Sequence, residues 1–390
     1  MKKTKKRIAI LGSTGSIGQN TLAVVRDFKD RFEVVALAAG QNIGLLAEQV
    51  KEFQPEVVAV ATETKANGLA KLLETGQTQI LPGDYGYEQV ASIEKADLVV
   101  SAITGIAGLK PTLTALKNGK TLALANKESM VVAGALIREK AARTGSQIIP
   151  VDSEHSGIFQ CLLGQEKRFV KRVYLTASGG PFLRAPLSEL DTMSLEKALQ
   201  HPRWKMGRKV TIDSATLINK GLELIEARWL FNLEPDQLGV LVHPQSIVHA
   251  LIEFVDGSVL AQLSQTDMKI PIQFALTFPE RWEAICPPLD LAQVGNLEFL
   301  QVDTNRFPLF GLAKKTLEAG LSFPVVLNAA NEVAVEAFLE EKIDFGKIYQ
   351  VVEHCVKNHQ SRVLNSLEEI IAVDQETRNW ARQYLGLKGK

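Results

Sequence analysis

Two carboxylates, Asp152 and Glu154, stand close together after a short apolar run and could bind a metal ion. In an extended segment alternate side chains point the same way, so the two charges would repel unless a cation or a proton lay between them. Carboxylate oxygens favour a hard ion such as Mg²⁺ or Mn²⁺. His155 would point elsewhere, which favours a structural or substrate-contacting role over metal ligation.

A second polar constellation, DSATLINKGLE at residues 213–223, is predicted to belong to a helix over 214–231. Asp213 or Ser214 suits the N-cap of that helix. Three side chains at helical spacing would share one face: Asn219, Lys220 and Glu223. Gly221 costs a helix interior about 1 kcal/mol relative to alanine, which favours close approach of another backbone. A solvated face with a Lys–Glu pair explains the same pattern, and spacing does not exclude Glu226 as the important carboxylate.

Phosphate-binding groups are also present. Ser178 precedes Gly179-Gly180 and offers a hydroxyl beside exposed N–H groups. Together with a second hydroxyl, an amide and a cation, it could hold a phosphomonoester; these groups are Ser214, Asn219 and Lys220. A serine beside glycines is also the ordinary composition of a turn.

A glycine-rich turn, GSTGSIG at residues 12–18, follows the first apolar run. Gly12 permits a tight turn, Gly15 lets a pyrophosphate approach the backbone, and Gly18 lets the following helix pack on the strand. The N-terminus of that helix would bind the phosphate. The spacing is GxxGxxG rather than GxGxxG, so its position between strand and helix carries the prediction of dinucleotide binding. A turn that serves only packing is the alternative.

The second apolar run ends in AAGQN at residues 38–42, without the acid that usually binds the ribose 2′-hydroxyl of NAD. Neutral amides and backbone N–H groups there could accept a 2′-phosphate. We therefore expect NADP(H) rather than NAD(H).

These groups need a scaffold, and the first 150 residues predict an α/β one. Seven β-rich runs alternate with helical stretches such as 19–29, 45–53 and 111–118. The runs are 7–11, 32–39, 56–61, 78–81, 97–102, 121–125 and 147–151. Several are continuously apolar, as in strands covered on both faces, which indicates a doubly wound parallel sheet of the Rossmann type. We take residues 1–150 as this domain.

The rhythm changes after residue 150. A strand at 169–177, a basic and aromatic loop at 201–208, and a hairpin of 246–255 with 258–264 through Asp256-Gly257 predict an α+β domain over residues 151–285. Residues 286–308 are interpreted as a linker, and residues 309–390 as a small α-helical domain. The hairpin is expected to form an interface, because exposed edge strands invite pairing.

Composition excludes several classes of protein. Of 390 residues 46% are hydrophobic, enough for a sizeable core. Lys+Arg and Asp+Glu each total 44, which argues against a long nucleic-acid-binding surface. No apolar stretch reaches membrane-spanning length, and the basic N-terminus meets glycine too soon for a signal peptide. Three scattered cysteines, Cys161, Cys286 and Cys355, indicate neither a disulfide framework nor a zinc cluster, so a cytoplasmic location is expected.

Six motifs occur in an order that resembles the 1-deoxy-D-xylulose 5-phosphate reductoisomerase family. They are GSTGSIG, ANKES (125–129), VDSEHS (151–156), TASGGPF (176–182), HPRWKMG (201–207) and DSATLINKGLELIEA (213–227). The resemblance implies an NADP-dependent oxidoreductase that rearranges and reduces 1-deoxy-D-xylulose 5-phosphate to 2-C-methyl-D-erythritol 4-phosphate, in the non-mevalonate route to isoprenoid precursors. It implies NADPH and a divalent metal ion, Mg²⁺ or Mn²⁺ with Co²⁺ as an option, and a homodimer with no nucleic-acid or membrane partner.

The resemblance also implies roles for single residues. The metal ligands would be Asp152, Glu154 and Glu223, which with Lys127 form the catalytic set. Substrate would be contacted by Lys127, Ser153, Glu154, Ser178, His201, Trp204, Ser214, Asn219, Lys220 and Glu223. The cofactor would be lined by Thr14, Gly15, Ser16, Ile17, Gly40, Gln41, Asn42, Asn126, Glu128 and Gly207. Residues 201–207 would form a flexible lid, with Trp204 over the substrate.

One departure and two rival functions remain. Many family members carry a basic residue where this chain has Gln41, so one contact to the 2′-phosphate is in doubt. An NADP-dependent dehydrogenase acting on a hydroxy or amino acid would need neither metal nor substrate phosphate. A cofactor-sensing protein would bind NADPH without turnover and leave the carboxylates and phosphate-binding groups idle.

Overall fold

The computed structural model describes residues 5–73, 77–204 and 206–387. The described chain forms two compact units, each built from separate segments. Unit 1 combines residues 1–129, 137–156 and 267–288, and unit 2 combines residues 130–136, 157–266 and 289–390.

Unit 1 contains a seven-stranded sheet in which every neighbouring pair is parallel. The strand order is β4-β3-β2-β1-β5-β6-β7. The strands are β1 Lys6–Leu11, β2 Phe32–Ala38, β3 Val57–Val60, β4 Gln79–Pro82, β5 Leu98–Ser101, β6 Thr121–Leu124 and β7 Ile148–Pro150. The order reverses between β1 and β5, which is the switch point where doubly wound sheets bind ligands. All seven predicted strands and the doubly wound arrangement are confirmed.

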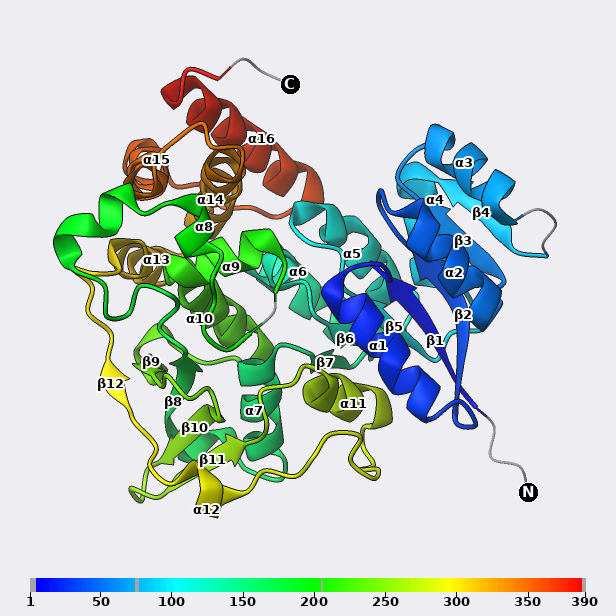
Figure 1. The fold of residues 1–390 in the computed structure, drawn as a ribbon, viewed down its shortest axis with the longest axis horizontal. Coiled ribbons are helices and arrows are strands. Elements are labelled where there is room, and N and C mark those ends of the chain that lie inside the picture. Colours follow the sequence, from blue (N-terminus) through cyan, green and yellow to red (C-terminus); the bar gives the residue numbers. More distant parts are fainter. Residues whose placement is uncertain (1–4, 74–76, 205, 388–390) are drawn as a thin grey trace. The chain divides into compact units, whose positions relative to one another are not determined.

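Helices connect these strands, and their blue and cyan ribbons are labelled beside the sheet in Figure 1. They are α1 Ser16–Asp27, α2 Ile43–Phe53, α3 Glu63–Leu73, α4 Gly83–Ser92, α5 Leu109–Lys117 and α6 Lys127–Thr144. A later helix, α11 Lys269–Thr277, also belongs to unit 1 and packs on α1. The core strand β1 is fully buried from Ile8 to Leu11, which explains its uninterrupted apolar sequence.

Unit 2 contains a five-stranded mixed sheet in the order β11-β10-β8-β9-β12. The strands are β8 Val170–Ala177, β9 Leu238–Val242, β10 Val248–Phe254, β11 Val259–Leu263 and β12 Leu300–Gln301. The predicted hairpin is confirmed, because β10 and β11 pair antiparallel on either side of Asp256-Gly257. The stretch 286–308, interpreted as a linker, carries two short elements, β12 and α12 Leu291–Val294.

The remaining elements of unit 2 are mostly helical. They are α7 Ser153–Leu162, which begins in unit 1, then α8 Leu195–Ala198, α9 Arg208–Ala215, α10 Ile218–Phe231, α13 Pro308–Ala319, α14 Phe323–Leu339, α15 Phe345–Asn358 and α16 Leu367–Tyr384. The C-terminal helices confirm the predicted helical region, with α14 packed against both α15 and α16 (Figure 1). Among the described residues, no helix combines the length and apolar character needed to cross a membrane.

Candidate functional site

The glycine turn after β1 has the geometry that its sequence predicts. Gly12 has a φ of +89°, and a Cβ there would lie 2.5 Å from the carbonyl oxygen of Ala102. A Cβ on Gly18 would lie 2.3 Å from the carbonyl oxygen of Gly12, so helix α1 lies directly against the turn. Gly15 is the N-cap of α1 and offers no side-chain cap. The first N–H groups of α1 are therefore suited to an anion.

The residues after β2 lie at the same edge of the parallel sheet. Gly40, Gln41 and Asn42 are all exposed, and Asn42 caps α2 by accepting a hydrogen bond from the Leu45 N–H at 3.1 Å. No acidic side chain occurs in this turn. The groups there that could face a 2′-phosphate are therefore an amide and backbone N–H groups.

Asn126 organises the turn between β6 and α6. Its buried side chain donates to the carbonyl oxygens of Ile103 and Gly105 and to the Glu128 carboxylate, and its oxygen accepts from the Ser129 N–H. Glu128 is likewise buried. The two residues tie the ends of β5 and β6 together at the edge where the glycine turn lies.

The carboxylates after β7 are held by neighbours within unit 1. The Lys127 Nζ lies 2.7 Å from the Asp152 Oδ2, and the Ser153 hydroxyl donates to Glu154 at 2.6 Å. The prediction of an extended segment here is wrong. Helix α7 begins at Ser153, and the Ser156 N–H donates a hydrogen bond to the Asp152 carbonyl at 2.8 Å. Glu154 therefore lies in the first turn of a helix, where the dipole stabilises its charge. His155 is fully buried in that same turn.

Helix α10 of unit 2 carries the predicted polar face. Lys220 and Glu223 are both buried, with Nζ and Oε2 2.6 Å apart, and Asn219 donates to the other Glu223 oxygen. A solvated face is therefore excluded. Gly221 makes the close approach expected of it, because a Cβ there would lie 2.3 Å from the Cβ of Ala313 in α13. Glu226 is also buried, so burial does not separate it from Glu223.

The single helix predicted over 214–231 is broken. Helix α9 ends at Ala215, and Leu217 takes a left-handed conformation with a φ of +60° before α10 begins. Neither Asp213 nor Ser214 is an N-cap, because both lie inside α9, whose N-cap is Gly207. Ser214 is thereby buried near the start of α10, in the same unit as Asn219 and Lys220.

Ser178 is held by a histidine and a backbone N–H. Its hydroxyl lies 2.8 Å from the His201 Nε2 and accepts from the Gly180 N–H at 3.1 Å. Gly180 has a φ of +66° and packs against α9, where a Cβ would meet the Ser214 carbonyl at 2.7 Å. This contact brings the serine–glycine turn and Ser214 together, as a shared phosphate site would require.

His201 is a neutral acceptor. Its Nδ1 accepts hydrogen bonds from the backbone N–H groups of Arg203 at 3.2 Å and Trp204 at 2.8 Å. Burial and the nearby charge of Lys220 lower the pKa of His201 to about 4. The proton of the neutral ring is therefore on Nε2, which donates to Ser178 and leaves the serine hydroxyl hydrogen for another acceptor.

The 201–207 loop contacts a segment that the motifs above do not include. Arg203 donates to the Pro244 carbonyl at 3.1 Å, and the ring of Trp204 lies 6.3 Å from that of His249. Lys205 of the predicted lid lies outside the described residues. The motif HPQSIVH over 243–249 could have marked this segment as part of the site, since it combines two histidines with a turn residue. Its contacts with the 201–207 loop could not be predicted, because the fold brings the two segments together.

The fold and these side chains define a dinucleotide-dependent α/β enzyme. Three family models match this chain: 1-deoxy-D-xylulose 5-phosphate reductoisomerase over residues 8–134, and its two C-terminal domains over residues 148–231 and 263–380. The reductoisomerase of Thermodesulfovibrio yellowstonii is 48% identical over 98% of this chain and 100% of its own length. That of Chlorobium phaeovibrioides is 51% identical over 97% of this chain and 98% of its own.

Solved structures of reductoisomerases also match this chain over nearly its full length. A DOX-P reductoisomerase in complex with NADPH, fosmidomycin and magnesium has a TM-score of 0.93 and 41% identity, covering 98% of both chains. The enzyme from Zymomonas mobilis in complex with NADPH has a TM-score of 0.91 and 40% identity, covering 98% of this chain and 99% of that one. The chain belongs to the 1-deoxy-D-xylulose 5-phosphate reductoisomerase family.

Proposed function

We propose that the polar groups described above assemble the active site of a 1-deoxy-D-xylulose 5-phosphate reductoisomerase. The chain converts 1-deoxy-D-xylulose 5-phosphate to 2-C-methyl-D-erythritol 4-phosphate with NADPH and a divalent metal ion, a step toward isoprenoid precursors. The observation that carries this function is the polar set on α10, where the half-buried amide of Asn219 contacts a lysine–carboxylate pair, Lys220 and Glu223, that is itself buried.

The metal ligands in this proposal are Asp152, Glu154 and Glu223. Their donor set fits the ion, because carboxylate oxygens suit Mg²⁺ and Mn²⁺ and no thiolate lies among them. A bound ion supplies charge stabilisation for vicinal substrate oxygens. Lys127 balances the Asp152 charge and Ser153 hydrogen-bonds Glu154, so each carboxylate of unit 1 is held in a defined orientation.

The substrate phosphate is assigned to groups of unit 2. Ser178 and Ser214 supply hydroxyls, Asn219 an amide, and Lys220 the positive charge. Neutral His201 supports this site by orienting Ser178 without adding a second cation. Phosphate binding remote from the reacting carbons can be used to orient them.

The cofactor is assigned to unit 1. Its phosphates would lie on the glycine turn at Thr14, Gly15, Ser16 and Ile17, with Gly40, Gln41 and Asn42 near the adenosine end and Asn126, Glu128 and Gly207 lining the rest. NADPH supplies hydride. The exposed amide of Gln41 and the absence of an acid beside it support the choice of NADPH over NADH.

The chain's own residues supply position and electrostatics. Lys127 is buried and held in place by Asp152, so it would present a preorganised ammonium donor to a developing oxyanion. The 201–207 loop would close over bound substrate, with Trp204 excluding water from a reactive aldehyde. We assign cofactor binding to residues 1–150, catalysis to 151–285, linkage to 286–308 and support to 309–390.

Two further assignments concern the context of the enzyme. A homodimer is supported by exposed apolar side chains on and beside the edge strand β11, namely Val255, Val259 and Leu260. A cytoplasmic location is supported by the absence of a disulfide among the cysteines of the described residues, Cys161, Cys286 and Cys355.

The test is the oxidation of NADPH with 1-deoxy-D-xylulose 5-phosphate, with and without Mg²⁺ or Mn²⁺. We expect metal-dependent oxidation, and we expect Glu154→Gln to lower kcat/KM at least about a hundredfold, because it removes a ligand charge, while leaving NADPH binding and the melting temperature nearly unchanged. Turnover without metal would favour a simple dehydrogenase. A folded chain that binds NADPH but never oxidises it would favour the sensor.

A further inference from the structure

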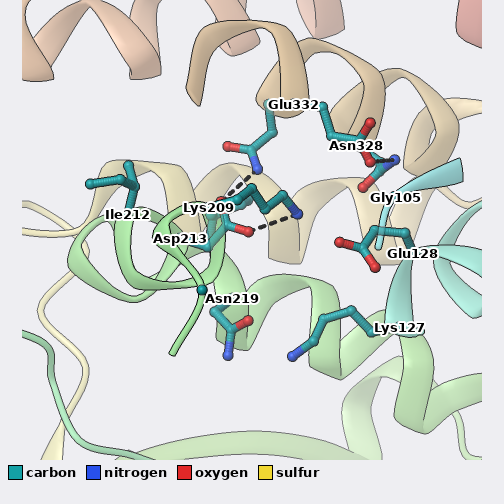
Figure 2. A network of polar contacts seen from close by, with 12 residues as sticks. Gly105, Lys127, Glu128, Lys209, Ile212, Asp213, Asn219, Asn328 and Glu332 are labelled. Atoms are coloured by element: carbon teal, nitrogen blue, oxygen red, sulfur yellow. Dashed lines mark hydrogen bonds and ion pairs between the residues drawn. The ribbon is translucent and has the colours of Figure 1, made fainter. Parts of the chain in front are cut away.

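A buried carboxylate in α9 is held from a distant part of the chain. Asp213 is 1% exposed, and its two oxygens have separate partners. One accepts a hydrogen bond from the Asn331 amide at 2.9 Å, and the other lies 2.8 Å from the Lys209 Nζ. Figure 2 shows the dashed contact between Lys209 and Asp213 beneath helix α14.

Asn331 is unusual for its position. It is fully buried in α14, a helix whose neighbouring residues are mostly alanine and valine, and it reaches α9 across 118 residues of sequence. A buried amide is retained at a cost unless its hydrogen bonds are made. The bond to Asp213 is charge-assisted and therefore among the stronger ones in this unit.

Helix α9 connects two parts of the proposed substrate site. It begins immediately after the 201–207 loop, with Gly207 as its N-cap, and carries Ser214 next to Asp213. Beyond the left-handed Leu217, the chain continues directly into α10 with Asn219 and Lys220. A shift of α9 would therefore move the end of the loop and the phosphate-binding groups together.

We propose that Asn331 is a positioning residue for the substrate phosphate. By holding the Asp213 carboxylate, Asn331 fixes α9 against α14 and so fixes Ser214 and Gly207, where the 201–207 loop ends. The helical C-terminal region thus contributes to substrate binding without touching substrate. This inference rests on the phosphate site proposed above.

Asn328 provides a matched control one helical turn away. It is the same residue type, is equally buried, and lies in the same helix. Its amide donates to Glu332 at 3.1 Å, and Glu332 in turn pairs with Arg378 at 2.5 Å. Figure 2 labels Asn328 and Glu332 of this pair, and Arg378 lies in α16. These contacts stay within the C-terminal helices, so the loss of the Asn328 amide should cost stability without moving α9.

The experiment compares Asn331→Ala with Asn328→Ala in the full chain. We expect Asn331→Ala to raise the KM for 1-deoxy-D-xylulose 5-phosphate about tenfold with a much smaller change in kcat, because a buried carboxylate loses a donor and α9 shifts. The KM for NADPH should not change. Asn328→Ala should leave all three constants near the wild-type values even where its melting temperature falls.

A charge swap supplies the rescue. Asn331→Asp places two carboxylates face to face and should weaken substrate binding further, whereas adding Asp213→Asn restores a donor–acceptor pair with the roles exchanged. We expect the double variant to recover most of the KM. The variants should rank in the same order in their affinity for inorganic phosphate as in their affinity for substrate. Titration calorimetry measures the phosphate affinity without depending on turnover.

The outcomes separate the two proposals. An inactive wild-type chain would contradict the proposed function, while phosphate calorimetry would still decide the role of Asn331. Equal substrate KM and phosphate affinity in Asn331→Ala, Asn328→Ala and wild type would overturn the positioning role. If Asn331→Ala does not fold, the comparison of Asn331→Asp with the swap decides the matter: no recovery in the swap overturns the proposal.

Discussion

At the scale of single residues, the protonation state of His201 organises the substrate loop. The ring accepts two backbone N–H groups at Nδ1 and donates from Nε2 to Ser178, which only the neutral tautomer with the proton on Nε2 can do. Protonation would replace an acceptor with a donor and disrupt the turn at Arg203 and Trp204. The lowered pKa keeps this arrangement intact at neutral pH.

His201 should therefore make folding less stable in acid. Its pKa is lower in the folded chain, about 4 against 6.5, so the unfolded chain binds more protons between these values and stability falls as the pH decreases through this range. Asn retains an acceptor but does not titrate. Between about pH 7 and pH 5 the free energy of unfolding should fall by on the order of 1 kcal/mol more in wild type than in His201→Asn, measured by urea denaturation. An equal pH dependence of the free energy of unfolding in the two proteins would contradict the lowered pKa of His201.

At the scale of elements, α10 depends on close packing against α13. The absence of a side chain at Gly221 lets the helices meet where Ala313 already occupies the space. This contact fixes the helix that carries the buried Lys220–Glu223 pair.

Gly221→Ala should lower the free energy of unfolding by about 1–3 kcal/mol, because the new methyl overlaps that of Ala313. Adding Ala313→Gly removes the overlap. The double variant should be more stable than Gly221→Ala, despite the helix propensity lost at residue 313, and thermal denaturation measures both. A further loss of stability in the double variant would show that the overlap is not the cause.

The sequence predicted elements where one local signal dominated. The seven parallel strands were recognisable because buried strands are continuously apolar, as in β1. The break between α9 and α10 was not, because Leu217 has no special tolerance for a left-handed conformation and the fold imposes it. The start of α7 at Ser153 was missed for a similar reason: a polar segment after a strand resembles an extended loop as much as a first helical turn.

At the scale of the whole molecule, the mixed sheet of unit 2 ends in an apolar edge. Strand β11 is one of the two edge strands, the other being β12, and its Val259 and Leu260 are exposed by 52% and 43%. An exposed apolar edge strand is a template for pairing with a second chain. Pairing between two copies would cover it in a homodimer.

Lysine at both positions, Val259→Lys with Leu260→Lys, should shift the chain toward monomer, because charges on an edge strand oppose pairing. Val363→Lys serves as the control, since Val363 is even more exposed, at 64%, but lies outside the sheet. Sedimentation velocity of wild type and the two variants measures their oligomeric state. A monomeric wild type would contradict the homodimer, and an unchanged double-lysine variant would place the interface elsewhere.

In the candidate site, too, residues close in sequence could be grouped from the sequence, whereas contacts between distant residues could not. Residues that cluster in one motif, such as Asn219, Lys220 and Glu223, could be grouped from spacing alone. The partner of Asp213 could not, because Asn331 lies 118 residues away in an apolar helix without a local motif. Chain folding, rather than any local pattern, brings the two together.

The discontinuous make-up of unit 1 has a consequence for how the protein is made. Helix α11 packs on α1 and on the last two strands of the sheet, and the Lys6 Nζ bonds to the Leu276 carbonyl at 2.8 Å. A ribosome releases the first 150 residues long before this helix, so the nascent nucleotide-binding sheet cannot gain its full cover until residue 288 has emerged. To express this unit alone with its full cover, residues 267–288 would have to be fused to the N-terminal segment in one polypeptide.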